Sequence, residues 1–216
     1  MSNIDIIIKV LSGSGATLLI FFSTLLFALP LGLLICFSRM SKNIILSNVS
    51  RVFISILRGT PLMLQLIVWF FGPYYIFGIT LKPIWRIISV IIGFSINYAA
   101  YFAEIYRGGI NSIPVGQYEA ATVLGYDKKQ TFMKIIFPQM VKRVIPPVTN
   151  EIITLIKDTS LAFVIAYSEM FTIAKQIAAT KTTIMPLFVA GTFYYIFNYL
   201  VAIFMEFVEK RFDYYK

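Results

Sequence analysis

Residues 16–37, ATLLIFFSTLLFALPLGLLICF, contain no charged side chain. The uncharged stretch extends further, from Lys9 to Arg39, and about 20 apolar residues in a helix are enough to cross the hydrocarbon core of a bilayer. Pro30 is compatible with such a helix, because neighbouring helices can satisfy the carbonyl that it leaves without a partner. We therefore predict a transmembrane helix over about residues 12–38, and with it a membrane protein.

The overall composition and three further apolar stretches support the same fold class. Of the 216 residues, 58% are hydrophobic and only 13% are charged, whereas about a quarter of the residues of a soluble protein are charged. The apolar stretches predict further membrane spans over residues 60–80, 86–107 and 183–206. The N-terminus lacks the basic region of a signal peptide, so we expect the first span to be retained.

Residues 141–180 are harder to assign, because charged residues, Pro146 and Pro147 interrupt them. The loop 38–58, the stretch 107–143 and the C-terminal tail all carry an excess of lysine and arginine, which keeps such segments in the cytoplasm. These three segments can lie on the same side of the membrane only if residues 144–168 cross it once. We therefore predict an all-α membrane protein of five spans, with the N-terminus outside, the C-terminus inside and a fourth span over 143–165. The basic residues concerned are Arg39, Lys42, Arg51, Arg58, Arg107, Lys128, Lys129, Lys134, Lys142, Arg143, Lys210, Arg211 and Lys216.

The residue inventory argues against several functions. There is no histidine, and Cys36 is the single cysteine, which removes Cys/His metal sites and an internal disulfide. The sequence contains no GxxxxGK[ST], HExxH or GxSxG motif, so we expect no ATP hydrolysis, no other catalysis and no cofactor in this chain. Basic cytoplasmic loops explain the net charge of +9 without a nucleic-acid partner.

Residues 117–140, QYEAATVLGYDKKQTFMKIIFPQM, are too polar to cross the membrane. Residues 118–124 predict a short helix that Gly125 ends. Asp127 and Gln130 form a D-x-x-Q capping box at the start of a second helix, which we expect Pro138 to end. The segment 114–138 is therefore predicted to be a helix–glycine–helix hairpin in the cytoplasm. It can rest on lipid as an interfacial hairpin, or fit a groove on a partner protein.

A few polar residues lie inside the predicted spans. Glu151 falls near the middle of the membrane, where an acid costs roughly 2.5 kcal/mol or more and often marks a transport pathway; the alternative is a structural ion pair or hydrogen bond. Asn97 can face Glu151 across a cavity, or hold two helices together. Glu104 and Arg107 are three residues apart on a helix, so we expect them to pair with each other.

Two short polar motifs mark predicted helix ends. Asp158, Thr159 and Ser160 follow Lys157 and indicate a helix end or a re-entrant turn with hydroxyl caps. Arg58-Gly59-Thr60-Pro61 opens the second span. Its proline begins a helix whose first backbone amides attract carboxylates, although a helix start with an anchoring arginine explains the motif equally well.

Several blocks of the sequence resemble one known family. Glu119-Ala120-Ala121, Gly125, Ile136 and Pro138 have the spacing of the EAA signature, which marks permease subunits of bacterial ABC importers. The chain also resembles the polar amino acid branch of these permeases, although Phe137 stands where the family more often has leucine. The matching blocks cover nearly the whole chain in order: Arg58-Gly59-Thr60-Pro61 with Gln65, AYFAEIYRGGI (100–110), Gly116-Gln117, Pro138-Gln139 and TNEIITLIKDTSLAFVI (149–165).

The resemblance implies a role and a set of partners. Residues 1–216 would form one transmembrane permease domain in the bacterial cytoplasmic (inner) membrane. It would form the pathway with a second permease, either a copy or a paralogue, and receive amino acids from an extracytoplasmic binding protein. Residues 118–136 would be coupling helices that dock into a cytoplasmic ATPase subunit, which binds ATP and magnesium. The residues implied at that interface are Glu119, Ala120, Ala121, Gly125, Tyr126 and Asp127.

An acid in the middle of the membrane favours a cationic substrate, because a carboxylate can pair with guanidinium or ammonium there. We therefore predict that Glu151, with Asn97 and Tyr101, meets the side chain of a basic amino acid such as arginine, lysine or histidine. The α-carboxylate would lie near Gly59 and Thr60. The remaining candidate substrate-binding residues are Arg58, Gln65, Asp158 and Ser160. A neutral or acidic substrate such as glutamine or glutamate, and a secondary transporter that needs no ATPase, remain alternatives.

Overall fold

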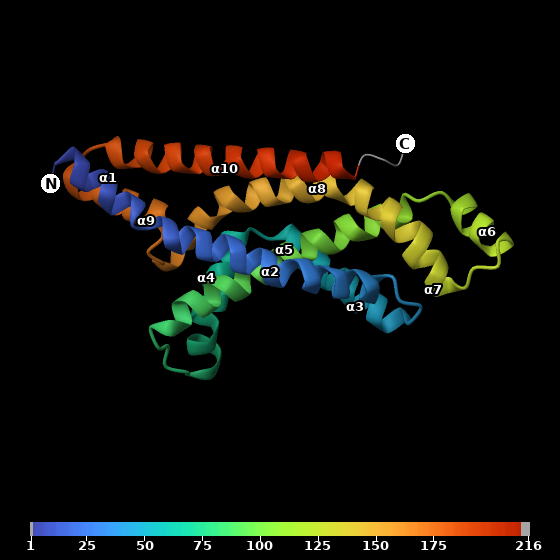
Figure 1. The fold of residues 1–216 in the computed structure, drawn as a ribbon. Helices are drawn as coiled ribbons and strands as arrows, with labels where there is room; N and C mark the ends of the chain where they lie inside the picture. The colour runs from blue at the N-terminus through green and yellow to red at the C-terminus, as the bar shows by residue number, and fades with distance from the viewer. Residues whose placement is uncertain (1, 213–216) are drawn as a thin grey trace.

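The computed structural model describes residues 2–212, which form helices and connecting turns with no strand among them. Figure 1 shows an elongated molecule with α1 and α9 at one end and α6 and α7 at the other. Lys216, one of the predicted cytoplasmic charges, lies outside the described residues. The helices are α1 (Asn3–Leu11), α2 (Ser14–Arg39), α3 (Ile44–Gly59), α4 (Leu62–Phe77), α5 (Ile84–Asn111), α6 (Val115–Val123), α7 (Lys128–Thr131), a π-helical turn (Phe132–Ile136), α8 (Phe137–Asp158), a 3₁₀ segment (Thr159–Ile165), α9 (Met170–Lys181) and α10 (Met185–Arg211).

Three helical stretches of the described chain are long and apolar enough to cross a membrane by themselves: Asn3–Arg39, Ile84–Asn111 and Met185–Arg211. Two bent pairs also qualify if each pair counts as one span. One is α3 with α4, bent by 108°, and the other is Lys128–Ile165 with α9, bent by 56°. The described residues therefore allow between three and five spans.

The core of the molecule is the contact between α2 and α5. Gly32 of α2 lies so close to α5 that an added Cβ would stand 2.8 Å from Phe102 Cβ and 3.1 Å from the Ala99 carbonyl oxygen. Phe94 and Phe102 of α5 are fully buried in this core. A small residue on α2 therefore lets two long helices approach closely, as is common between membrane helices.

We expect Gly32→Ala to destabilise the chain by about 1–3 kcal/mol, because α2 and α5 would have to separate to admit the methyl group. The control is Gly15→Ala in the same helix, where an added Cβ meets nothing within 4 Å. The melting temperature of the detergent-solubilised protein should fall for Gly32→Ala and stay level or rise for Gly15→Ala. Equal melting temperatures for the two variants would show that the α2–α5 approach is not tight.

The loop predicted over residues 38–58 is wrong for most of its length, because residues 44–59 form α3. Asn43 caps this helix by accepting hydrogen bonds from the backbone amides of Ile45 and Leu46, at 3.0 and 3.3 Å. One face of α3 packs Ile54 and Leu57 into the core. Basic residues suggested a loop, but a helix can carry them on a single stripe while its other faces remain apolar.

Pro138 does not end the helix that begins after Asp127. The chain passes from α7 through the π-helical turn directly into α8, where Pro138 occupies the first turn. Pro138 follows the π-helical turn, where the regular α-helical hydrogen-bond pattern is already interrupted, so the amide that proline lacks does not break the helix there. The expected break is therefore absent, and residues 128–165 form one continuous helical body.

A buried acid fixes the turn between the 3₁₀ segment and α9. Glu169 is fully buried, and its carboxylate accepts hydrogen bonds from the Thr172 and Phe171 amides at 2.6 and 2.8 Å and from Tyr194 Oη at 2.9 Å. Thr17 Oγ1 of α2 donates a longer bond of 3.4 Å. Glu169 thus caps α9 and joins it to α2 and α10, a role that the sequence did not indicate.

Candidate functional site

A polar hollow of about 500 Å³ lies where the α3–α4 corner meets α5 and α8. The corner arises because Thr60 is extended and Pro61 occupies the N-cap position of α4. Most of the predicted substrate-binding residues meet here. The wall consists of Arg58, Gly59, Thr60, Pro61 and Leu62 from the corner, Asn97, Tyr98 and Tyr101 from α5, Glu151, Thr154 and Asp158 from α8, and Leu161.

Two carboxylates of α8 face this hollow, and they differ in whether another residue hydrogen-bonds to them. Glu151 and Asp158 are seven residues apart, and so lie on one face of the helix two turns from each other. Tyr98 Oη donates a hydrogen bond of 2.7 Å to Asp158 Oδ2. No hydrogen bond or ion pair to Glu151 occurs within residues 2–212. Glu151 is therefore the carboxylate available to a ligand, and Asp158 is held in place by α5.

Arg58 brings a positive charge to the same hollow. Its guanidinium carbon lies 5.0 Å from the centre of the Tyr101 ring, a geometry in which the face of the ring attracts the cation. No ion pair within 4 Å joins Arg58 to Glu151. The hollow thus presents a carboxylate and a guanidinium that do not neutralise each other by direct contact.

Two buried amides hold the corner against α5. Asn97 Nδ2 donates to the Leu57 carbonyl at 3.1 Å and to Gln65 Oε1 at 3.0 Å. Gln65 Nε2 donates to Leu57 O at 2.9 Å and to Thr60 Oγ1 at 2.8 Å. Asn97 therefore lines the hollow while its amide joins two helices, the alternative that the sequence had left open. Gln65 lies behind the corner and does not line the hollow.

Ser160, like Gln65, is a predicted residue that does not reach the wall of the hollow, and several contributors were missed. The Ser160 hydroxyl donates to the Lys157 carbonyl at 2.7 Å, and Ser160 does not line the hollow. Thr154 lies three residues after Glu151, so helical spacing could have placed it there. Tyr98 could not be found in this way, because its role depends on the contact between α5 and Asp158.

The segment 114–138 forms the predicted hairpin at the far end of the molecule (Figure 1). Gly125 has a φ of +77° and follows α6 at the C′ position, as expected for a left-handed terminator. Asp127 and Gln130 form both hydrogen bonds of the capping box. The predicted stop and start between the two helices are thus confirmed, although α6 begins at Val115 rather than at residue 118.

The hairpin exposes a surface that includes most of the residues predicted to contact an ATPase. Glu119, Ala120, Gly125, Tyr126 and Asp127 are exposed, whereas Ala121 is fully buried within the hairpin. Val123 and Leu124, which the sequence did not single out, are 88% and 70% exposed. Apolar side chains at such exposure are typical of an interaction surface.

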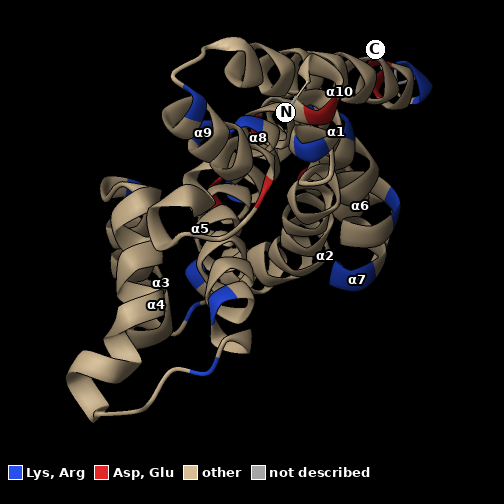
Figure 2. Cartoon of the chain, turned by 90° about the vertical axis from the view of Figure 1, so that its left-hand side faces the viewer, with Lys and Arg blue, Asp and Glu red and all other residues tan. Residues whose placement is uncertain are grey.

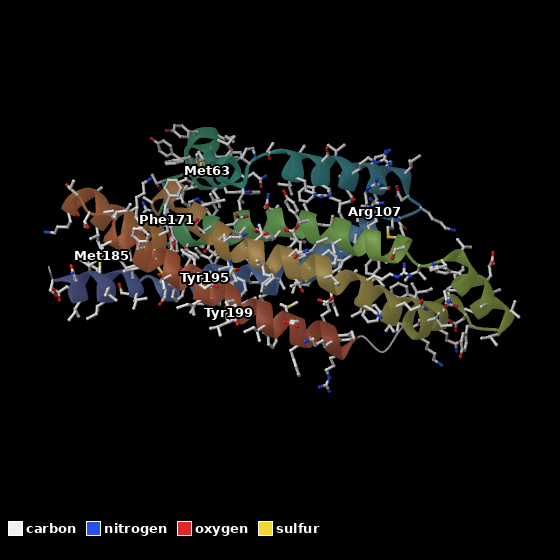
Figure 3. The ribbon with its side chains drawn as sticks, turned by 90° about the horizontal axis from the view of Figure 1, so that it is seen from above. Met63, Arg107, Phe171, Met185, Tyr195 and Tyr199 are labelled. Atoms are coloured by element: carbon white, nitrogen blue, oxygen red, sulfur yellow. The ribbon has the colours of Figure 1, made fainter. Side chains whose placement is uncertain are left out.

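Two other features of the described chain, a local ion pair and an apolar hollow on α10, suit a polar substrate less well. Glu104 and Arg107 form the predicted local pair, with Arg107 Nη2 2.6 Å from Glu104 Oε2. A hollow of about 460 Å³ on α10 is lined mainly by apolar residues around Gly191, and Figure 3 shows its residue Tyr195, with Tyr199, along α10. Such a surface suits lipid better than a polar ligand. No cluster of three potential metal ligands occurs within residues 2–212.

The family described as "Binding-protein-dependent transport system inner membrane component" matches residues 28–214. The probable amino-acid ABC transporter permease protein YckA of Bacillus subtilis (strain 168) is 37% identical over 207 residues, or 95% of this chain and 90% of that protein. The L-cystine transport system permease protein TcyB of the same organism is 38% identical over 192 residues, or 88% and 80% of the two chains. A crystal structure of an amino acid ABC transporter with histidines superposes with a TM-score of 0.86 at 27% identity, over 94% of both chains.

Other relatives carry the names of different substrates. The putative glutamine transport system permease protein GlnP of Rickettsia felis is 31% identical over 95% of this chain and 93% of that protein. The arginine transport system permease protein ArtQ of Bacillus subtilis is 32% identical over 94% and 91%. The resemblance found in the sequence blocks is thus confirmed, and the chain belongs to the family of binding-protein-dependent transport system inner membrane components, as an amino-acid ABC transporter permease.

Proposed function

We propose that the chain is the permease subunit of an ATP-driven importer that prefers basic amino acids. The observation that carries the substrate proposal is the Glu151 carboxylate, which faces a polar hollow without a hydrogen bond or ion pair from residues 2–212. A charged group in a membrane span is costly. A guanidinium or ammonium group of the substrate would supply the partner that Glu151 lacks.

The remaining groups of the hollow suit the other end of an amino acid. Arg58 can bind the α-carboxylate, and the first residues of α4, Leu62 and Met63, offer amides without intrahelical partners. The side chain and the α-carboxylate would then point in opposite directions, towards Glu151 and Arg58. The volume of about 500 Å³ is ample for one amino acid, since ligand pockets commonly enclose about 300–1,000 Å³.

Comparison with relatives supports this class of substrate without fixing it. The ArtQ relative is named for arginine, and the similar crystal structure is described with histidines. The GlnP and TcyB relatives are named for glutamine and L-cystine, so a neutral amino acid is the second candidate. For that candidate Glu151 would have to bind the α-ammonium group instead of a cationic side chain.

The same proposal covers topology and partners. Five spans, with the N-terminus outside and the C-terminus inside, place the α6–α7 hairpin in the cytoplasm of a bacterial cell. Lys128, Lys129 and Lys134 belong to this segment, and Figure 2 shows basic residues on α7, in agreement with the positive-inside rule. A cytoplasmic ATPase would dock on the hairpin, a second permease would complete the pathway, and an extracytoplasmic binding protein would deliver the amino acid.

The proposal is tested by uptake into proteoliposomes that contain the permease, its ATPase and its binding protein. We expect uptake of labelled L-arginine to require luminal ATP with Mg²⁺, and to exceed uptake of L-glutamine and L-glutamate. Equal uptake from vesicles without the ATPase would indicate a secondary transporter. A preference for glutamine over arginine would favour the neutral substrate.

A further inference from the structure

The hollow that Glu151 and Asp158 face is called the carboxylate hollow below. A second hollow, of about 470 Å³, adjoins it and contains three arginines. Arg39 comes from the end of α2, and Arg51 and Arg58 come from α3. Arg58 and Tyr101 line both hollows, so the stacked Arg58–Tyr101 pair forms the boundary between them. We call this second hollow the arginine vestibule; Ser55 and Glu104 complete its polar lining.

The arginines lie on a polar stripe of an otherwise apolar helix. Arg51, Ser55 and Arg58 are spaced i, i+4 and i+7, and so share one face of α3. Val52 and Ile56, which flank this stripe, are exposed and suit contact with lipid. Arginine inside a membrane span almost always faces a water-filled cavity or the interior of a bundle. The stripe therefore indicates an aqueous route along α3.

The vestibule lies on the hairpin side of the carboxylate hollow. Arg51 precedes Arg58 by seven residues, or about 10 Å along the helix, towards the turn after α2. On α5, Glu104 follows Tyr101 in the direction of α6. Figure 3 shows the same order, with Arg107 nearer the α6–α7 end than Met63, which lies beside the α3–α4 corner.

The charges of the vestibule leave a positive excess. Both oxygens of the Glu104 carboxylate accept hydrogen bonds from Arg107, which neutralises the acid. Arg39 Nη1 donates to Ser47 Oγ at 3.1 Å, a neutral partner that leaves its charge uncompensated. A ligand of this hollow must therefore be an anion, and the planar fork of arginine favours a carboxylate or a phosphate.

We propose that Arg39, Arg51 and Arg58 bind the α-carboxylate of the transported amino acid after it leaves Glu151, which makes the vestibule an exit site on the cytoplasmic side. This inference rests on the proposed function. A lipid phosphate is the alternative anion, but Arg58 lies fourteen residues, about 21 Å, along α3 from Ile44. A headgroup would have to leave the interface to reach it. The arginines would also repel a basic side chain, which favours release.

The test uses proteoliposomes that contain the complete transporter and carry L-arginine in the lumen, on the ATPase side. Luminal L-arginine should inhibit uptake of labelled L-arginine more strongly than its decarboxylated amine, which lacks the α-carboxylate. Arg51→Gln should raise the luminal concentration of L-arginine for half-inhibition about tenfold, the factor for one hydrogen bond to a charged group. Inhibition by the amine should stay the same or strengthen.

Two comparison variants make the result specific. Arg51→Lys should give an intermediate shift, since it keeps the charge and loses the fork. Lys42→Gln removes the same charge in the α2–α3 turn outside the vestibule and should behave as the unmodified chain. If Arg51→Gln changes the half-inhibitory concentrations of L-arginine and the amine by the same factor, or changes neither, the exit site is refuted.

The lipid composition of the vesicles distinguishes the two anions that the vestibule could bind, the α-carboxylate of the substrate and a lipid phosphate. The change in the half-inhibitory concentration of L-arginine caused by Arg51→Gln should be the same in vesicles of phosphatidylcholine alone and in vesicles with phosphatidylglycerol. A shift found only with the anionic lipid would assign the vestibule to a headgroup and overturn the inference. Glu151→Gln, assayed in parallel for substrate preference, reports on the proposed function separately, so failure of one claim is not mistaken for failure of the other.

Discussion

Leu124→Asp is expected to release the ATPase from the permease and to abolish ATP-dependent uptake. Leu124 lies between α6 and α7 and is 70% exposed in the isolated chain. If the ATPase covers this surface, the variant buries an unpaired carboxylate in an apolar contact, which is strongly unfavourable. We expect the amount of ATPase that co-purifies with the permease to fall roughly tenfold or more, as for a central interface residue.

A control variant and a melting temperature distinguish a loss of ATPase docking from a loss of folding. Gln176→Asp adds the same carboxylate at an exposed position of α9, at the opposite end of the molecule (Figure 1), and should leave co-purification unchanged. The melting temperature of Leu124→Asp in detergent should stay close to that of the unmodified chain, because Leu124 packs little within the chain. Normal recovery of the ATPase with Leu124→Asp would place the docking surface elsewhere.

Glu151→Gln is expected to remove the preference for basic amino acids. The amide keeps the size of the side chain and loses the charge that would pair with guanidinium. Truncating one partner of a buried charge pair typically costs about 2–5 kcal/mol, so kcat/KM for L-arginine should fall by roughly 30-fold or more. Uptake of L-glutamine should change far less, because a neutral side chain makes no ion pair with Glu151.

The effect must be measured as a ratio in one complex, since the binding protein also selects substrates. The same binding protein should therefore be used with each permease, and kcat/KM should be compared for arginine and glutamine. Glu206→Gln is the control, because Glu206 forms an exposed pair with Lys210 on α10. An unchanged arginine-to-glutamine ratio in Glu151→Gln would remove Glu151 from substrate selection.

The continuous helical body of residues 128–165 is relevant to how movement of the ATPase would reach the substrate site. This helical body begins in the hairpin and carries both Glu151 and Asp158. We expect movement of a docked ATPase to be transmitted along it to the carboxylate hollow, because a helix carries displacement along its axis more readily than a loop. The geometry of this body departs from a regular α-helix at the π-helical turn Phe132–Ile136 and in the 3₁₀ segment Thr159–Ile165.

Features that depend on local chemistry could be predicted from the sequence. The capping box at Asp127, the stop at Gly125 and the Glu104–Arg107 pair each involve residues within a few positions of one another. The apolar stretch before Arg39 is long enough to predict a membrane helix by itself. In these cases no distant part of the chain competes with the local preference.

Features that depend on tertiary contact could not be predicted in this way. Helix α3 was taken for a loop because its arginines suggested solvent, whereas they line a stripe beside α5. Pro138 was expected to end a helix, but it follows a π-helical turn that already interrupts the regular hydrogen-bond pattern, and the helix continues through it. The pairing of Tyr98 with Asp158 joins residues sixty positions apart, and no local spacing indicates it.

The most direct test of the central claim is equilibrium binding of amino acids to the permease–ATPase complex without the binding protein. Calorimetry in lipid nanodiscs should detect saturable binding of L-arginine, and Glu151→Gln should abolish it. L-Glutamine and L-glutamate should bind at least tenfold more weakly, the factor that corresponds to about 1.4 kcal/mol. Absence of arginine binding, or equal binding of all three amino acids, would contradict a permease that selects basic amino acids through Glu151.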